Sequence, residues 1–316
     1  MSVASVQTAE DLSAALNAKG FVGAVIPITH LGDLEAEFQQ LIDGGCIDQG
    51  AYTRYMTNFA FHAPDALPGA TSIILVAGPQ PQQEITVHWH GVIFSVIVPP
   101  TYANFTQPND PESLLTQLLA PSGYSILRAR VPQKLLAAHA GLAQYGRNNI
   151  TYYPDWGSFS KPITFFSDFP PSADPWQPIE RAPQCDTCTA CARACPTGAI
   201  VLDRDVIHAD WCLTYNNENP APLPGWIDSN WHHALVGCLR CQLACPMNVG
   251  VKSWRESVGD IEETETELLL TIPTKEALTP NLTRILETTG LIDDLDIVGR
   301  NLSVLLETLE ARGRFL

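Results

Sequence analysis

Eight of the nine cysteines in this chain of 316 residues lie within 61 positions. The first four form the run Cys185-Asp-Thr-Cys188-Thr-Ala-Cys191-Ala-Arg-Ala-Cys195-Pro196. This is the spacing of bacterial ferredoxins, in which three cysteines hold one [4Fe–4S] cluster and the fourth reaches a second cluster. A shorter run follows, Cys238-Leu-Arg-Cys241-Gln-Leu-Ala-Cys245-Pro246, and lacks one cysteine of the pattern. The two runs predict that this part of the chain folds around two metal clusters.

Cys212 lies between the runs and can supply the missing ligand. The predicted ligands are Cys185, Cys188, Cys191 and Cys245 for cluster 1, and Cys195, Cys212, Cys238 and Cys241 for cluster 2. The alternatives are structural zinc, usually held by two C-x2-C pairs, and unrelated buried cysteines. Zinc does not explain two runs that each end in Cys-Pro. Cys46 stands apart and is interpreted as a buried free thiol.

The net charge and the first 20 residues exclude several classes of protein. A net charge of −16, with only 18 Lys and Arg, argues against a general binder of nucleic-acid backbones. The first 20 residues show no export signal, and no stretch approaches 18 consecutive apolar residues. Clustered cysteines without an export signal are typical of metal binding in a reducing cytoplasm, so a cytoplasmic protein without a membrane partner is expected.

Hydrophobic periodicity predicts alternating helices and strands over the first half of the chain. Helices are expected at 7–20, 34–42, 113–119 and 134–145, and strands at 72–76, 85–98 (broken near His90-Gly91), 149–153 and 163–166. A Pro-rich linker is expected at 170–184. After Trp254 the chain becomes acidic and Leu-rich, with helices expected at about 261–270, 275–288 and 294–312.

A glycine-rich loop precedes the cysteines, Ala140-Gly141-Leu142-Ala-Gln-Tyr145-Gly146-Arg147-Asn148-Asn149, and Gly157-Ser158-Phe159 follows it. Together with the cysteine pattern, over roughly residues 130–250, this resembles the epoxyqueuosine reductase family. Members of that family are cobalamin-dependent tRNA-modifying enzymes, and the corrinoid reductive dehalogenases are more distant relatives.

The resemblance implies an α/β (α+β) nitroreductase-like domain at 1–170 and a ferredoxin-like two-[4Fe–4S] domain at 171–254. An acidic helical segment at 255–316 completes the chain. It also implies a cofactor wall of Gly141, Tyr145, Gly146, Arg147, Asn148 and Ser158. Cobalamin is the first cofactor expected, a flavin the second, and no cofactor the third. From the residues alone, these glycines also fit a helix C-cap and a tight turn.

The chain departs from that family at the proposed proton donor, an Asp in a D-S-x-P step. Here the stretch reads Ala129-Arg130-Val131-Pro132, with Ala129 in place of the acid. The C-terminal segment is also acidic rather than basic. A substrate other than epoxyqueuosine is therefore expected, and tRNA is not expected as a partner.

Several other residues carry weaker signals. His88 and His90 are spaced to share one strand face and form a metal-ligand candidate without a third ligand; a polar strand face is the alternative. Tyr102 follows Pro99-Pro100-Thr101 and is a weak catalytic candidate, an ordinary turn being the alternative. His139 lies on the helix before the glycine loop, and His232-His233 lie near the second run, where hydrogen bonds to cluster sulfur tune potentials.

The favoured function is an iron–sulfur oxidoreductase. It would pass single electrons from an external donor, such as a ferredoxin or flavodoxin, through two clusters to a pocket-bound cofactor or small-molecule substrate. The alternatives are a non-catalytic ferredoxin-like carrier or electron-transfer subunit, and a redox-sensing regulatory protein. The chain length argues against a plain carrier, because two clusters need only about 60 residues.

Overall fold

The computed structural model describes residues 6–105, 110–204 and 206–311, and the chain divides into two compact units. Unit 1 consists of Met1–Pro79, Phe105–Thr189 and Leu202–Ile207, and unit 2 of Gln80–Asn104, Ala190–Val201 and His208–Leu316. The division falls within the first cysteine run. The expected bounds 1–170, 171–254 and 255–316 stay a prediction.

Unit 1 is built on a four-stranded antiparallel sheet in the order β1-β2-β8-β5. Its strands are β1 (Val22–Pro27), β2 (Ser72–Pro79), β8 (Ser160–Ser167) and β5 (Ile126–Arg128). The first seven residues of β2 are buried, because helices cover the sheet on both faces. This is why β2 reads in the sequence as a continuous apolar run.

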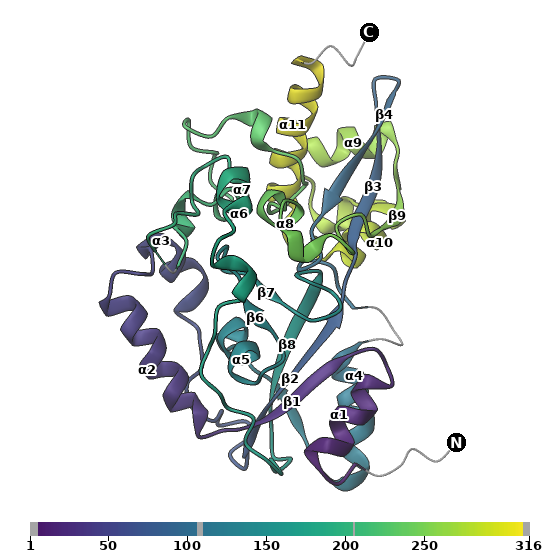
Figure 1. Ribbon diagram of the computed structural model, residues 1–316. Coiled ribbons are helices and arrows are strands. Elements are labelled where there is room, and N and C mark those ends of the chain that lie inside the picture. Colours follow the sequence, from purple (N-terminus) through teal and green to yellow (C-terminus); the bar gives the residue numbers. More distant parts are fainter. Residues whose placement is uncertain (1–5, 106–109, 205, 312–316) are drawn as a thin grey trace. The chain divides into compact units, whose positions relative to one another are not determined.

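The two faces of this sheet bear separate hydrophobic layers. Figure 1 shows the helices that cover these faces. Helices α1 (Ala9–Asn17) and α4 (Pro111–Leu119) pack on one face around Ile74, Val76 and Phe165. Helices α2 (His30–Asp43) and α5 (Gln133–His139) pack on the other around Ile73, Leu75 and Phe166. Unit 1 also contains α3 (Gln49–Ala51), the hairpin β6 (Gln144–Tyr145) with β7 (Thr151–Tyr152), and an extended segment at 170–184.

Unit 2 is built on a three-stranded sheet in the order β4-β3-β9. Strands β3 (Gln82–Trp89) and β4 (Val92–Val98) form a hairpin, and β9 (Arg255–Ile261) pairs parallel to β3. The hairpin turns at His90 (φ 48°) and Gly91 (φ 76°), and two positive φ angles are what a two-residue turn of this kind needs.

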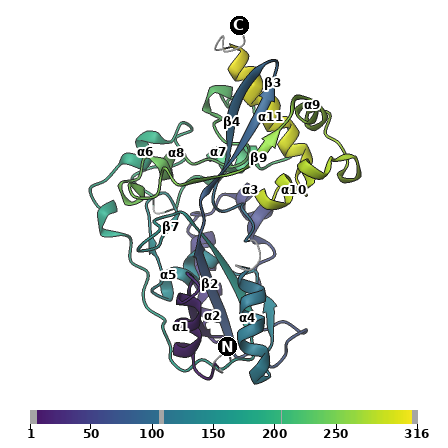
Figure 2. The ribbon, with the colours of Figure 1, turned by 90° about the vertical axis from the view of Figure 1, so that its right-hand side faces the viewer.

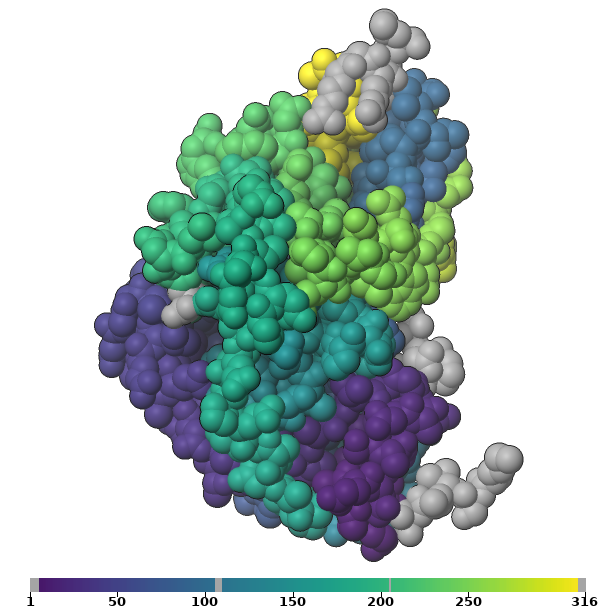
Figure 3. Space-filling model, viewed as in Figure 1, coloured from purple at the N-terminus to yellow at the C-terminus, as the bar shows by residue number. Residues whose placement is uncertain are grey.

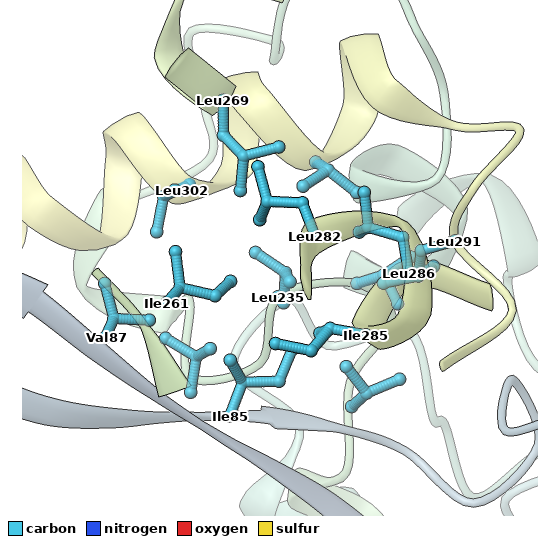
Figure 4. Packing of buried hydrophobic residues seen from close by; sticks show 14 of the residues in the cluster. Ile85, Val87, Leu235, Ile261, Leu269, Leu282, Ile285, Leu286, Leu291 and Leu302 are labelled. Atoms are coloured by element: carbon cyan, nitrogen blue, oxygen red, sulfur yellow. The ribbon is translucent and has the colours of Figure 1, made fainter. Parts of the chain in front are cut away.

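Three helices cover this sheet: α9 (Glu263–Leu270), α10 (Pro280–Thr289) and α11 (Leu295–Ala311) (Figure 2). Their leucines and isoleucines interlock with Ile85 and Val87 of β3, as Figure 4 shows. Each such buried side chain stabilises the unit by about 1.5–3 kcal/mol. Three short helices carry or flank the cysteines: α6 (Ala190–Ala194), α7 (Leu213–Asn217) and α8 (Arg240–Leu243).

The sequence predicted many of these elements, but it missed strands β1 and β5, and two other expectations were wrong. The helix expected at 134–145 ends at His139, and Tyr145 lies in β6 instead. Strand β9 was expected to be part of the acidic helical segment. Within the described ranges, no helix is long and apolar enough to cross a membrane.

Candidate iron–sulfur and cofactor sites

Cys185 directly follows the segment 170–184 and lies in a 3-10 turn of unit 1, Pro183–Cys185. Its side chain is buried, and its N–H donates to the Ala182 carbonyl at 2.8 Å. Its own carbonyl accepts a hydrogen bond from Nη2 of Arg147 at 2.6 Å. The glycine loop therefore holds the backbone of the first predicted cluster ligand directly. Cys188, the second ligand in unit 1, is partly exposed.

In unit 2, three of the four ligands predicted for cluster 2 lie near one another. Cys195 follows α6, Cys212 is the N-cap of α7, and Cys238 lies two residues before α8. Burial raises the pKa of the Cys212 thiol, and the charge of Cys195 adds to the rise. Burial likewise raises the pKa of the Cys238 thiol to about 12, with further contributions from Cys212 and Cys195.

Backbone donors already point at these sulfurs. The N–H groups of Thr214 and Tyr215 and the Thr214 hydroxyl bond to Cys212, and the Arg240 N–H bonds to Cys238. These hydrogen bonds offset part of the rise in the pKa of each thiol. Hydrogen bonds of this type stabilise thiolates and set cluster potentials. This donor set fits cysteines that bind a cluster.

The remaining cysteines of unit 2 lie on short helices. Cys191 is in α6 and Cys241 in α8, and these two helices pack together. Cys245 follows α8, where the fully buried Asn248 donates to the Gln242 carbonyl at 2.8 Å. Among the described residues, no three His, Cys, Asp or Glu side chains converge on a single metal ion.

The adjacent histidines near the second run have different surroundings. His233 accepts the Leu239 N–H at Nε2 (3.1 Å), and its Nδ1 faces the Trp231 carbonyl at 3.3 Å. His232 is 5% exposed, and neither ring nitrogen has a partner among the described residues. Burial, followed by the charges of Arg300, His233 and Arg240, lowers the pKa of His232 to about 4. A role for His232 in tuning a cluster stays a prediction.

The glycine loop of unit 1 begins where α5 ends. Gly141 has φ 69°, and a Cβ there would lie 2.7 Å from Nε2 of Gln177. A Cβ on Gly146 would lie 2.5 Å from Cε2 of Tyr152. Gly141 therefore terminates the helix, as the C-cap interpretation expected, and both positions require close approach of the backbone to other groups.

The side chains of this loop are largely buried. Arg147 and Asn148 are 8% and 3% exposed, and Asn148 donates from Nδ2 to the Tyr152 hydroxyl at 2.9 Å. Nε of Arg147 and Oδ1 of Asn148 have no partner among the described residues. Burial raises the pKa of the Tyr145 hydroxyl, with a smaller contribution from the charge of Glu37. Ser158 is also buried. The loop thus contains one buried donor and one buried acceptor that have no partner among the described residues.

An aromatic stack fixes the segment 170–184, which runs along the surface in Figure 3. The Trp176 ring lies between the rings of His30 (4.1 Å) and His139 (3.9 Å). His139 contacts two acceptors, the Gln177 carbonyl and the Glu37 carboxylate, each at 2.7 Å. Burial opposes protonation, but these bonds and the charges of Glu37 and Asp33 raise the pKa of His139 overall. His139 is therefore not a surface residue, and the segment is held against unit 1.

Three further positions bear on the sequence predictions. Ala129 is 3% exposed in a core layer, and its N–H and carbonyl both pair with Thr164. The Tyr102 hydroxyl donates to the Glu218 carboxylate, and its catalytic role stays a prediction. His88 lies on β3, whereas His90 is exposed in the turn after the strand has ended. The strand alternation expected to align the two histidines is therefore absent.

The sequence did not reveal a buried polar network around Asn217. This residue carries no motif, and its partners are up to 84 positions away in the chain. The only sign of such a role is that Asn217 is fully buried in the structure. The sequence does not show that a polar residue of a short helix is buried.

Comparison with known proteins places these features in context. A family model described as a 4Fe-4S double cluster binding domain matches residues 184–248. Curated epoxyqueuosine reductases of Gloeobacter violaceus and Aliivibrio fischeri are each 36% identical to the chain, over 126 and 121 residues. These stretches cover 39% and 38% of this chain, and 38% and 31% of the relatives. The chain thus spans less than two fifths of the length of these relatives.

The fold likeness extends further. The structure of the Streptococcus thermophilus epoxyqueuosine reductase has a TM-score of 0.66 and 17% identity, and the match covers 96% of this chain and 82% of that one. A Bacillus subtilis epoxyqueuosine reductase, solved with its catalytic aspartate loop swung out of the active site, has a TM-score of 0.59 and 19% identity. That match covers 94% of this chain and 80% of that one. Another epoxyqueuosine reductase, solved with a tRNA stem loop, has a TM-score of 0.58 and 19% identity, covering 95% of this chain and 84% of that one.

The expectation that tRNA is not a partner of this chain stays a prediction. The chain contains a 4Fe–4S double-cluster binding domain and resembles the epoxyqueuosine reductases, in sequence over about two fifths of its length and in fold over nearly all of it.

Proposed function

We propose that this chain is an iron–sulfur oxidoreductase that passes single electrons through two [4Fe–4S] clusters to a cofactor or substrate at the glycine loop. The match of residues 184–248 to a double-cluster domain carries the proposal. It contains all seven cysteines of the two runs and Cys212. Within unit 2, the N–H donors at Cys212 and Cys238 would stabilise the charge of a reduced cluster.

The ligand assignment follows the crossed pattern of bacterial ferredoxins. Cys195, Cys212, Cys238 and Cys241 would hold cluster 2, and the mutual proximity of the first three supports this set. Cys185, Cys188, Cys191 and Cys245 would hold cluster 1, and this set rests on the spacing of the runs. A cytoplasmic donor such as a ferredoxin or flavodoxin would supply the electrons.

The glycine loop fits a cofactor that offers both hydrogen-bond acceptors and donors. A buried polar group without a partner costs about 1–3 kcal/mol, and this loop contains two, Nε of Arg147 and Oδ1 of Asn148. The peripheral amides of a corrinoid would satisfy both, as would the ring edge of a flavin. We propose cobalamin as the first candidate cofactor, because the chain resembles a cobalamin-dependent family. Its site would lie in a nitroreductase-like domain. When bound, it would supply a cobalt centre that exchanges single electrons.

The proposed substrate is not epoxyqueuosine, because no acid occupies the position of the family's proton donor. Ala129 lies in the core layer that contains Ile73, Leu75 and Leu136, and both of its backbone groups are used. A carboxylate there would be buried among hydrocarbon at high cost. A proton for the product would therefore come from another group or from water.

One spectroscopic titration tests the cofactor part of the proposal. Cob(II)alamin added to the anaerobically reconstituted protein should give a base-off EPR signal. Asn148→Ala should weaken that interaction, whereas Gln133→Ala, which removes a unit 1 amide with a partner in Thr164, should not. An unperturbed cob(II)alamin spectrum would reject the corrinoid. Failure of flavin binding as well would reject a cofactor at the glycine loop and would favour the non-catalytic electron carrier.

A further inference from the structure

The side chain of Asn217 bonds to both backbone groups of Gly237, the residue before Cys238. Its Nδ2 donates to the Gly237 carbonyl at 2.6 Å, and its Oδ1 accepts the Gly237 N–H at 2.7 Å. Asn217 is fully buried and ends α7, the helix that begins directly after Cys212. One amide therefore joins the segment that carries Cys212 to the segment that carries Cys238.

Helix α11 holds the backbone of Asn217 itself. The Asn217 carbonyl accepts Nη2 of Arg300 at 2.7 Å and Nδ2 of Asn301 at 3.0 Å. Asn301, also fully buried, donates to the Leu235 carbonyl at 2.9 Å. Arg300 further donates to the carbonyls of Asn219 and Ala221. The guanidinium thus holds the chain beyond α7, and the amide of Asn301 bridges the two segments a second time.

The conformation of Gly237 leaves this segment little freedom. Gly237 has φ 67°, and a Cβ there would lie 2.5 Å from the Tyr102 hydroxyl oxygen and 2.7 Å from Cε2 of its ring. The Tyr102 hydroxyl in turn donates to Glu218, the residue after Asn217. The backbone before Cys238 is therefore in close contact with an aromatic ring and is bonded by the Asn217 amide.

We propose that Asn217, supported by Arg300 and Asn301, is a positioning residue that sets Cys238 in register with Cys212 for binding of cluster 2. The inference rests on the proposed assignment of both cysteines to that cluster. Holding ligands in place beforehand reduces the conformational entropy lost on binding. Losing an outer contact of this kind typically costs 10–100-fold in metal affinity. It also gives the C-terminal helix a function, since α11 supplies two of the three side chains.

The test compares variants of the reconstituted full chain. Asn217→Ala should retain cluster 1 but lose cluster 2, so that iron falls from about eight to about four atoms per chain. Arg300→Gln should keep both clusters, with a chelator removing one of them at least about 10-fold faster than in the unmodified protein. Arg284→Gln is the matched control, because Arg284 also donates to a backbone carbonyl, that of Val258, away from the cysteines.

The outcomes separate this inference from the proposed function. Full iron content in Asn217→Ala, with unchanged chelation kinetics in Arg300→Gln, would overturn the positioning role. Equal acceleration in Arg284→Gln would also overturn it, since the effect would then be general destabilisation. If Asn217→Ala does not fold, the comparison of Arg300→Gln with Arg284→Gln decides. An unmodified protein without iron would instead overturn the proposed function.

Discussion

Replacing Arg147 with methionine tests whether the glycine loop holds the first cluster ligand. Arg147→Met keeps an unbranched chain but removes the guanidinium that donates to the Cys185 carbonyl at 2.6 Å. Both residues are more than nine-tenths buried. A hydrogen bond from a charged group contributes about 1.5–3 kcal/mol. Since 1.4 kcal/mol is a factor of about ten, local opening around Cys185 should become about 10- to 100-fold more frequent.

Native-state hydrogen exchange of the reconstituted protein measures that opening. The amides to follow are those of Ala182 and Cys185, which donate to the Tyr145 and Ala182 carbonyls. Arg130→Met is the matched control, because Arg130 donates to the Tyr55 carbonyl elsewhere in unit 1. Unchanged exchange in Arg147→Met, or equal acceleration in the control, would refute the reasoning.

Two further predictions concern unit 1. The pKa of His139 is raised, so its protonated ring stabilises the docked segment 170–184. This stabilisation is complete below a pH of about 6.5 and is lost as the pH rises through the raised pKa. Exchange at the Gln177 amide, corrected for intrinsic rates, should show this dependence, and Glu37→Gln should weaken it; a flat profile in the unmodified protein would count against it. Gly141→Ala should lower the free energy of unfolding by about 1–2 kcal/mol because of its φ of 69° and contact with Gln177. Gly32→Ala, in α2 with open space around it, should raise that free energy by up to about 1 kcal/mol, and denaturant titration compares the two.

The sequence predicted those helices, strands and turns whose cause lies in neighbouring residues. The buried run at 72–76 is β2, and the turn expected near His90-Gly91 joins β3 to β4. The helix that ends at His139 shows where local patterns fail, because either Gly141 or Gly146 could end it. Gly141 prevails because the chain reverses there and packs against Gln177. Which glycine ends a helix depends on a contact 36 positions away, and no local pattern contains it.

Pairings between distant segments account for the rest. Strand β9 has charged and polar residues at its exposed positions, and it is a strand because it pairs with β3, about 170 residues earlier. The motifs likewise identified the cysteines but not the groups that hold them. Asn217 and Arg147 bond to backbone atoms of other segments. Every residue has a backbone carbonyl, so the sequence does not show which one accepts such a bond.

Quantifying metal in the anaerobically purified and reconstituted protein tests the central claim most directly. The account predicts about eight iron atoms per chain and, after reduction, EPR signals of two [4Fe–4S] clusters. About one zinc per chain and no iron would contradict it, and would make the cysteine runs a structural zinc site instead.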